Sequence, residues 1–158
     1  MKRKSSPPGI ADLKRVITRL RKQGVVKDYA LAGALAMAAW GYVRATTDFD
    51  VLVLADIADI PALEKRLFGK AFLIEDIDAI GLRFFYRRIP VDFMFARTKD
   101  ELAALKNAPY RSVAGTRIKV VPLDYLISTK SRSKRGKDRI DRVAVSYTHL
   151  TLPTNREV

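Results

Sequence analysis

Two aspartates separated by one residue are the first groups in this 158-residue chain that could do chemistry. Asp48 and Asp50 flank Phe49 at the start of the apolar run VLVL. In an extended strand alternate side chains share one face, so both carboxylates would project to one side while Phe49 points into a core. Like charges this close repel unless a cation lies between them, and an oxygen-only pair suits Mg²⁺. The pair therefore predicts a magnesium site or, because such pairs are common in loops, a turn with two solvated aspartates.

A third carboxylate, Asp92, interrupts the apolar segment 91–95. Burial of the odd-numbered apolar residues on one face places Asp92 on the opposite face. An acid in an apolar strand is costly unless it meets a cation or hydrogen-bond donors. We therefore expect Asp92 to meet a cation or hydrogen-bond donors, either in a functional site or as a satisfied structural aspartate. Four other aspartates lie in turn-like contexts and are expected to be solvated: Asp56, Asp59, Asp76 and Asp78.

An apolar run ends at Gly33, and a helix-like segment follows it. Glycine lets the backbone turn tightly and approach a ligand closely. The free N–H groups and the dipole at the start of a helix attract phosphate. Gly33 and Ala34 are therefore candidate phosphate contacts, although such a junction taken alone usually indicates only a turn.

The order of these features resembles the nucleotidyltransferase superfamily typified by DNA polymerase β. Its signature is an apolar residue, Gly, then Gly or Ser, and after a short helix an acidic–apolar–acidic triplet. Here these are 32–34 (AGA) and 48–50 (DFD). The run 44–50 (RATTDFD) is most similar to the minimal nucleotidyltransferases and the abortive-infection toxins. That similarity implies nucleotide contacts from Arg44 and Thr46.

The resemblance implies transfer of a nucleoside monophosphate from an NTP to an RNA (tRNA-like) or protein acceptor. Two Mg²⁺ ions would be held by Asp48, Asp50 and Asp92, and Asp92 could also deprotonate the acceptor hydroxyl. Ala34 departs from the family preference for Gly or Ser, so no side-chain hydroxyl is present there to contact phosphate. A helix that ends in Lys130 and a later Lys137-Asp138 pair also resemble the toxin-type members, which implies that Lys130 and Lys137 neutralise the triphosphate.

Two other function classes remain open. One is a catalytically inactive, basic nucleic-acid-binding module, and the other is an antitoxin that acts on a partner toxin protein. The chain has 30 Lys and Arg against 17 acidic residues, a net charge of +13 that favours a polyanionic partner. The basic run at 130–142 would hold a triphosphate or an RNA backbone, or would be a solvated linker.

The composition excludes several other chemistries. The chain has no cysteine, so it has no disulfide, thiolate metal site or Cys nucleophile.

The segment 145–158 (VSYTHLTLPTNREV) is similar to a translated sequencing-library adapter, so we expect the natural sequence to be interrupted near Ala144. His149, the only histidine, lies in that tail and is assigned no chemistry. With no signal peptide or membrane-spanning run, the chain is expected to be cytoplasmic.

The alternation of helical and strand patterns predicts an α/β (α+β) fold, a small mixed sheet flanked by helices around a nucleotidyltransferase-like core. We expect a flexible basic arm at 1–9 and one domain at 10–144. The expected strands are 25–32, 48–54, 71–74, 80–88, 91–95 and 118–121. The expected helices are 10–23, 34–41, 62–68, 98–106 and 122–130, the fourth with a capping box at Thr98 and Glu101.

Overall fold

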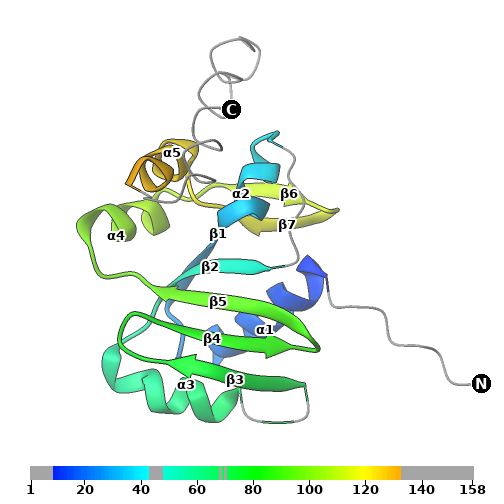
Figure 1. Cartoon of the computed structure of the whole chain (residues 1–158), viewed down its shortest axis with the longest axis vertical. Helices are drawn as coiled ribbons and strands as arrows, with labels where there is room; N and C mark the ends of the chain where they lie inside the picture. The colour runs from blue at the N-terminus through cyan, green and yellow to red at the C-terminus, as the bar shows by residue number, and fades with distance from the viewer. Residues whose placement is uncertain (1–8, 43–47, 68, 70, 133–158) are drawn as a thin grey trace, which may run out of the picture.

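The protein is seen here as a computed structural model that describes residues 9–42, 48–67, 69 and 71–132, the side chains of 130–132 excepted. Its centre is a five-stranded sheet made of β1 (Asp28–Ala32), β2 (Phe49–Leu54), β3 (Phe72–Ile77), β4 (Gly81–Tyr86) and β5 (Ile89–Phe95). The strand order is β1-β2-β5-β4-β3 (Figure 1). The pair β2/β5 is parallel and the other three pairs are antiparallel. This mixed sheet confirms the predicted fold class.

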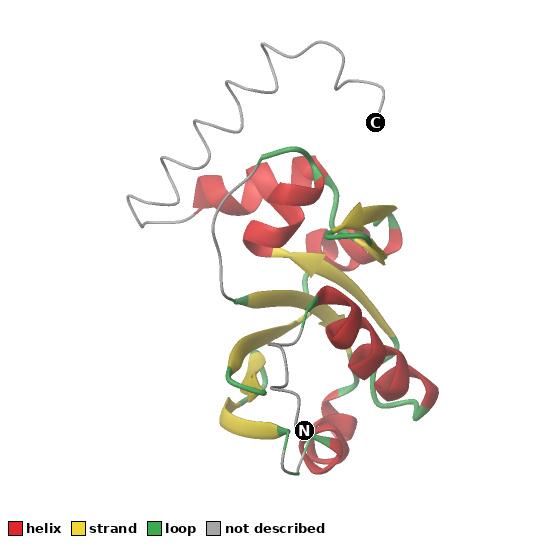
Figure 2. Cartoon of the chain, turned by 90° about the vertical axis from the view of Figure 1, so that its right-hand side faces the viewer, coloured by secondary structure: helices red, strands yellow, loops and turns green. Residues whose placement is uncertain are grey.

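Helices cover the sheet unevenly. They are α1 (Ile10–Lys22), α2 (Gly33–Ala39), α3 (Ile60–Arg66), preceded by the 3-10 turn η1 (Ile57–Asp59), α4 (Lys99–Lys106) and α5 (Leu123–Arg132). Figure 2 shows α1 and α3 on one side of the strands, and no helix of the described residues lies over the other side of β3, β4 and β5. No helix of the described residues is long and apolar enough to cross a membrane.

The covered side of the sheet is the hydrophobic core. The alternating residues of β4 and β5 that face α1 and α3 are almost fully buried, as the sequence pattern predicts. Phe84 and Phe93 are the largest of them, and their rings meet edge to face with centroids 5.1 Å apart. The predicted apolar face of α1 is confirmed too, since all five of its members are buried: Ile10, Leu13, Val16, Ile17 and Leu20.

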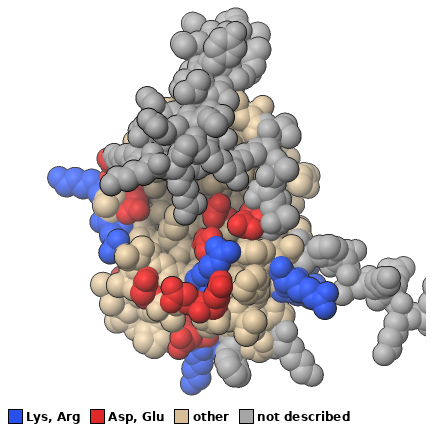
Figure 3. Space-filling model, in the orientation of Figure 1, with Lys and Arg blue, Asp and Glu red and all other residues tan. Residues whose placement is uncertain are grey.

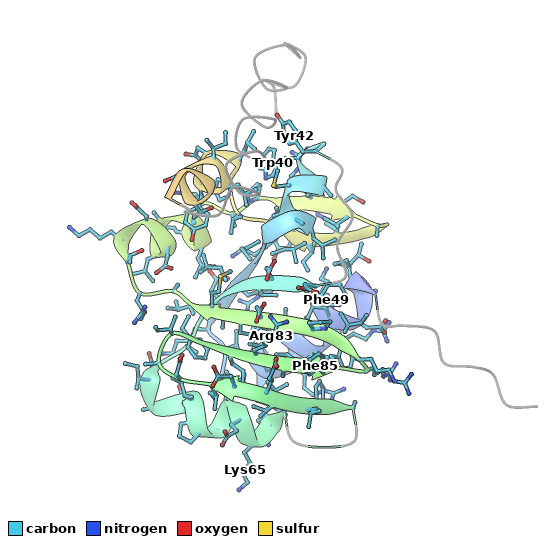
Figure 4. The ribbon with its side chains drawn as sticks, viewed as in Figure 1. Trp40, Tyr42, Phe49, Lys65, Arg83 and Phe85 are labelled. Carbon is cyan, nitrogen blue, oxygen red and sulfur yellow. The ribbon has the colours of Figure 1, made fainter. Side chains whose placement is uncertain are left out.

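The uncovered side, which we call the open face, is formed by the residues between these core positions. It carries Leu73, Arg83, Phe85, Asp92 and Met94, all at least partly exposed. Leu73 is 67% exposed and Met94 is 38% exposed, so this apolar surface lies open to solvent. Figure 4 shows the side chains of Arg83 and Phe85 on β4 projecting from this face.

A second, two-stranded sheet of β6 (Tyr110–Val113) and β7 (Thr116–Lys119) lies beside β1. Residue Val120 forms a parallel bridge to Leu31, and the N–H of Val121 donates to the Leu31 carbonyl at 3.0 Å. The Lys119 Nζ also donates to Asp28 Oδ1 at 2.7 Å, a contact that is largely shielded from solvent. The small sheet thereby holds the edge strand that leads into Gly33.

Two tight hairpins have the same backbone geometry. Arg87 and Arg88 form the two-residue loop between β4 and β5 with φ of 48° and 75°, and Ala114 and Gly115 form that between β6 and β7 with φ of 48° and 80°. Positive φ at both positions is the type I′ arrangement, for which Asn-Gly has the lowest energy.

Several element boundaries differ from the predictions. β1 begins at Asp28 rather than Val25, because the N–H groups of Val25 and Val26 bond to the Leu20 carbonyl and close α1. The expected strand 71–74 ends too early, because residues 75–77 continue β3 across a bulge between Ile74 and Asp76. An exposed edge strand tolerates such charged residues. The expected strand 80–88 ends two residues too late, because Arg87 and Arg88 form the hairpin turn rather than the end of β4.

Candidate active site

Two of the predicted acids are brought together by strand register. Asp50 of β2 and Asp92 of β5 are Cα partners on neighbouring parallel strands. Partners on adjacent strands project to the same face and lie about 4.8 Å apart at the backbone. Asp48 lies one residue before β2 begins, two residues before Asp50. All three are partly exposed, and Phe49 between the first two is buried, as the alternation predicts.

Gly33 lies directly against Asp50. A Cβ placed on Gly33 would be 2.1 Å from Asp50 Oδ2 and 2.8 Å from Asp50 Cβ. The residue also has φ of +64°, which side chains other than glycine rarely adopt. Two independent reasons therefore require glycine at position 33: the backbone turn and the close approach of the Asp50 carboxylate. No side chain of Ala32 caps α2, so its first N–H groups are not satisfied by a capping side chain.

Asp92 is paired with a residue of the neighbouring strand. Arg83 of β4 is its Cα partner, and Arg83 Nη1 donates to Asp92 Oδ2 at 2.7 Å. The Nε of the same guanidinium donates to Glu75 Oε2 of β3 at 2.8 Å. The attraction of Asp92 raises the pKa of Arg83, so this guanidinium stays charged. A chain of alternating charges thus crosses the open face from β3 to β5, and Figure 3 shows acidic and basic side chains together there.

Three contacts of Arg111 and Trp40 hold the C-terminal end of α2 in place. The Arg111 guanidinium lies 4.1 Å from the centre of the Trp40 ring, and its Nε donates to the Ala39 carbonyl at 2.9 Å. Trp40 Nε1 donates to the Val121 carbonyl at 2.9 Å. Met37 is buried, and Trp40 packs against the core. These contacts fix the helix that begins at Gly33.

The residues fit a divalent cation in type, with one condition on their placement. Their donors are carboxylate oxygens on neighbouring strands, which is the chemistry that Mg²⁺ prefers. Gly33 leaves room for the Asp50 carboxylate that a side chain would fill. Within the part of the chain that the structure describes, however, no three acidic, His or Cys side chains converge closely enough to form a metal-binding group. The condition is that Asp92 must release Arg83 before it can turn towards a shared ion.

The remaining predicted nucleotide contacts are not placed by the structure. Arg44, Thr46 and Lys137 lie outside the described residues, and so does the tail with His149. Lys130 lies in α5, and its side chain is outside the described part. These roles stay predictions.

The other aspartates differ among themselves. Asp56 is exposed and pairs with Lys27 at 2.6 Å. Asp78 accepts the N–H groups of Gly81 and Ile80, and these hydrogen bonds lower the pKa of its carboxyl. Asp76 is exposed but lies in β3. None of these three takes part in the acidic pair of Asp50 and Asp92.

The pairing of Arg83 with Asp92 was not predicted, although the sequence contains the signal. Strand alternation places Arg83 on the open face. If the loop between β4 and β5 is two residues long, at 87–88, then Arg83 must lie opposite Asp92, as it does. The register of a hairpin is fixed by its turn, and two arginines are not a turn signature that sequence rules identify.

Solved structures similar to this chain share its fold. The antibiotic-resistance factor ANT(2″)-Ia in solution matches 87% of this chain and 82% of its own with a TM-score of 0.58 at 15% identity. Its crystal structure with adenylyl-2″-tobramycin gives the same TM-score and identity, covering 87% of each chain. A Thermotoga maritima protein described as a nucleotidyltransferase, TM1012, matches with a TM-score of 0.53 at 17% identity, over 90% of this chain and 92% of its own.

These similarities show that the chain has the nucleotidyltransferase fold. No protein-family model matches the sequence, and no curated protein is significantly similar to it.

Proposed function

We propose that this protein is a nucleotidyltransferase that moves a nucleoside monophosphate from an NTP to an acceptor hydroxyl and releases pyrophosphate. The observation that carries the proposal is the register of Asp50 and Asp92 on parallel strands, with Gly33 packed against Asp50. The shared fold with ANT(2″)-Ia, a protein solved with an adenylylated product, supports the same reaction class.

The chain's own residues would divide the work as follows. Asp48, Asp50 and Asp92 would hold two Mg²⁺ ions, which supply charge stabilisation to the attacking and leaving oxygens of an in-line displacement. Asp92 accepts the proton of the acceptor hydroxyl, whose oxygen forms the new bond to the α-phosphorus. The bond from that phosphorus to the bridging oxygen breaks, and pyrophosphate leaves. The N–H groups of Gly33 and Ala34 bind phosphate oxygens, helped by Arg44, Thr46, Lys130 and Lys137.

The acceptor that we propose is an RNA or a protein in the cytoplasm, as part of a toxin–antitoxin or phage-defence system. ANT(2″)-Ia was solved in complex with adenylyl-2″-tobramycin, whose tobramycin part is a polycation. A net charge of +13 would repel such a polycation at long range and attract an RNA. The charge therefore supports a polyanionic acceptor.

The pairing of Asp92 with Arg83 supports one alternative. An arginine that already neutralises the third acid suits a catalytically inactive, basic nucleic-acid-binding module. Such a protein would bind RNA in a salt-dependent way without any requirement for Mg²⁺.

Labelled nucleotides test the reaction. The protein is incubated with Mg²⁺, cellular RNA and protein, and each NTP labelled either at the α- or at the γ-phosphate. Nucleotidyl transfer predicts acceptor labelling from the α-label only, with the γ-label released as pyrophosphate. Transfer of the γ-label would show phosphoryl transfer instead. Acceptor labelling that survives both Asp48→Asn and Asp50→Asn would refute the acidic site.

A further inference from the structure

A hollow of about 560 Å³ lies on the open face at the end of β3 and β4, away from α2. Its lining is apolar at the centre and cationic at the rim, and consists of Ala71, Phe72, Leu73, Phe85, Arg87 and Arg88. Leu73 and Phe85 are Cα partners, so their side chains stand together on the open face. A partly exposed aromatic ring beside a 67% exposed leucine is a surface that water solvates poorly.

The two arginines at the rim are held by an unfavourable backbone. Both lie at positive φ in the two-residue hairpin between β4 and β5, where Asn-Gly would cost less. The equivalent hairpin between β6 and β7 has the less costly Gly115 at its second position. Both guanidinium groups are exposed, and no ion pair to a carboxylate forms for either within the described ranges. Two unneutralised cations at a strained turn are placed to meet an external anion.

The hollow and the acidic pair share one face of the sheet. Phe85 comes two residues after Arg83 on β4, and Arg83 is the Cα partner of Asp92. Phe85 therefore lies about 7 Å along β4 from Arg83, and the hollow between β3 and β4 lies about two strand spacings, about 10 Å, across the sheet from the pair on β2 and β5. About two nucleotides of an extended RNA strand would span this separation. Figure 4 shows Arg83 and Phe85 side by side on the open face, and Lys65 of α3 pointing away from it.

We propose that this hollow is the acceptor subsite and that it binds one nucleotide of a single-stranded RNA. The base lies against Phe85 and Leu73, and Arg87 and Arg88 bind the adjoining phosphate. A base has a flat apolar face that the ring can cover, and the phosphate supplies the negative charge that the rim lacks. The role as an acceptor subsite rests on the proposed nucleotidyl transfer, whereas the binding of RNA does not.

Fluorescence anisotropy with a labelled single-stranded RNA of about ten nucleotides tests the subsite. The full chain is used without NTP or Mg²⁺, so that binding is measured apart from catalysis. The double variant Arg87→Asn/Arg88→Gly removes both charges and relieves the turn. This variant should melt at a higher temperature than the unchanged protein, yet bind RNA about tenfold more weakly. The slope of the logarithm of the binding constant against the logarithm of the salt concentration should become shallower by about 1.4.

Phe85→Ala should weaken binding about tenfold without a change in the salt slope, because stacking is lost and charge is not. Phe85→Trp should restore it. The matched control is Lys65→Gln/Arg66→Gln, which removes two exposed charges from α3 and should leave affinity within about twofold if binding is local.

Three results would overturn the subsite. They are unchanged affinity in the Asn-Gly variant, unchanged affinity in Phe85→Ala, and an equal loss in the α3 control, which would indicate non-specific charge. A fourth is transfer of label to a protein acceptor at the normal rate in both hollow variants. The proposed subsite and the proposed reaction can be rejected independently of each other. RNA binding that depends on Phe85 with no transfer of label by the unchanged protein would reject the reaction and keep the subsite.

Discussion

The two faces of the sheet use the same strands for opposite purposes. On β4 and β5 the residues that face α1 and α3 are apolar and buried, while the alternating residues on the open face form an ion-paired row and an apolar hollow. One-residue alternation therefore separates stability from chemistry. A substitution on the covered face should change folding and leave the site chemistry intact in whatever still folds. A substitution on the open face should change the chemistry of the site and leave the free energy of unfolding nearly unchanged.

The largest effect is expected on the covered face. Phe93 is 1% exposed and packs edge to face with Phe84, so Phe93→Ala should lower the free energy of unfolding by about 4 kcal/mol. Its neighbour Met94 lies on the open face and is 38% exposed, so Met94→Ala should cost less than about 1 kcal/mol. Urea denaturation measures both. Equal losses would contradict the division between the two faces.

Gly33 joins the covered core to the open site, and its replacement should have the next largest effect. Gly33→Ala combines a strained φ with a contact of 2.1 Å to Asp50 Oδ2, so we expect a loss of about 2 to 3 kcal/mol. Gly24→Ala is the matched control, because Gly24 has φ of +78° and nothing within 4 Å of its added Cβ. It should cost about 1 kcal/mol, the strain alone. A similar cost for both variants would show that Asp50 moves away freely.

Arg83 tests the open face with the smallest expected change in stability. Arg83→Gln removes two partly exposed ion pairs, to Asp92 and to Glu75, each of which contributes about 1 kcal/mol or less. If Asp92 must release Arg83 to share a metal ion, the variant should need less Mg²⁺ for half-maximal nucleotidyl transfer, because one competing cation is gone. A titration of the rate with Mg²⁺ measures this. An increased Mg²⁺ requirement would show that Arg83 positions Asp92 rather than competes for it.

Much of the fold could be predicted from local patterns. The apolar spacing of α1, the alternation of β4 and β5 and the capping box at Thr98 are strong signals, and the structure has all of them. β6 was not predicted, because its residues 110–112 are polar or exposed and its position depends on β7 rather than on an apolar pattern. The predicted strand 71–74 is shorter than the edge strand β3, because Glu75 and Asp76 resemble a turn in sequence.

The candidate site was only partly accessible to sequence reasoning. Spacing places Asp48 and Asp50 on one side of a strand, but it cannot show that Asp92 is the Cα partner of Asp50, because register depends on the whole sheet. The approach of Gly33 to Asp50 and the pairing of Arg83 with Asp92 are contacts between distant segments. Such contacts follow from tertiary structure.

The most direct test of the central claim compares two aspartates under one assay. Asp50→Asn and Asp56→Asn are the same chemical change, but Asp50 lies in register with Asp92 while Asp56 is exposed and paired with Lys27. The rate of pyrophosphate release from NTP with Mg²⁺ and the acceptor should fall by at least about 100-fold in Asp50→Asn. It should stay within about twofold of normal in Asp56→Asn. Equal rates in the two variants would contradict the assignment of the acidic pair as the reaction centre.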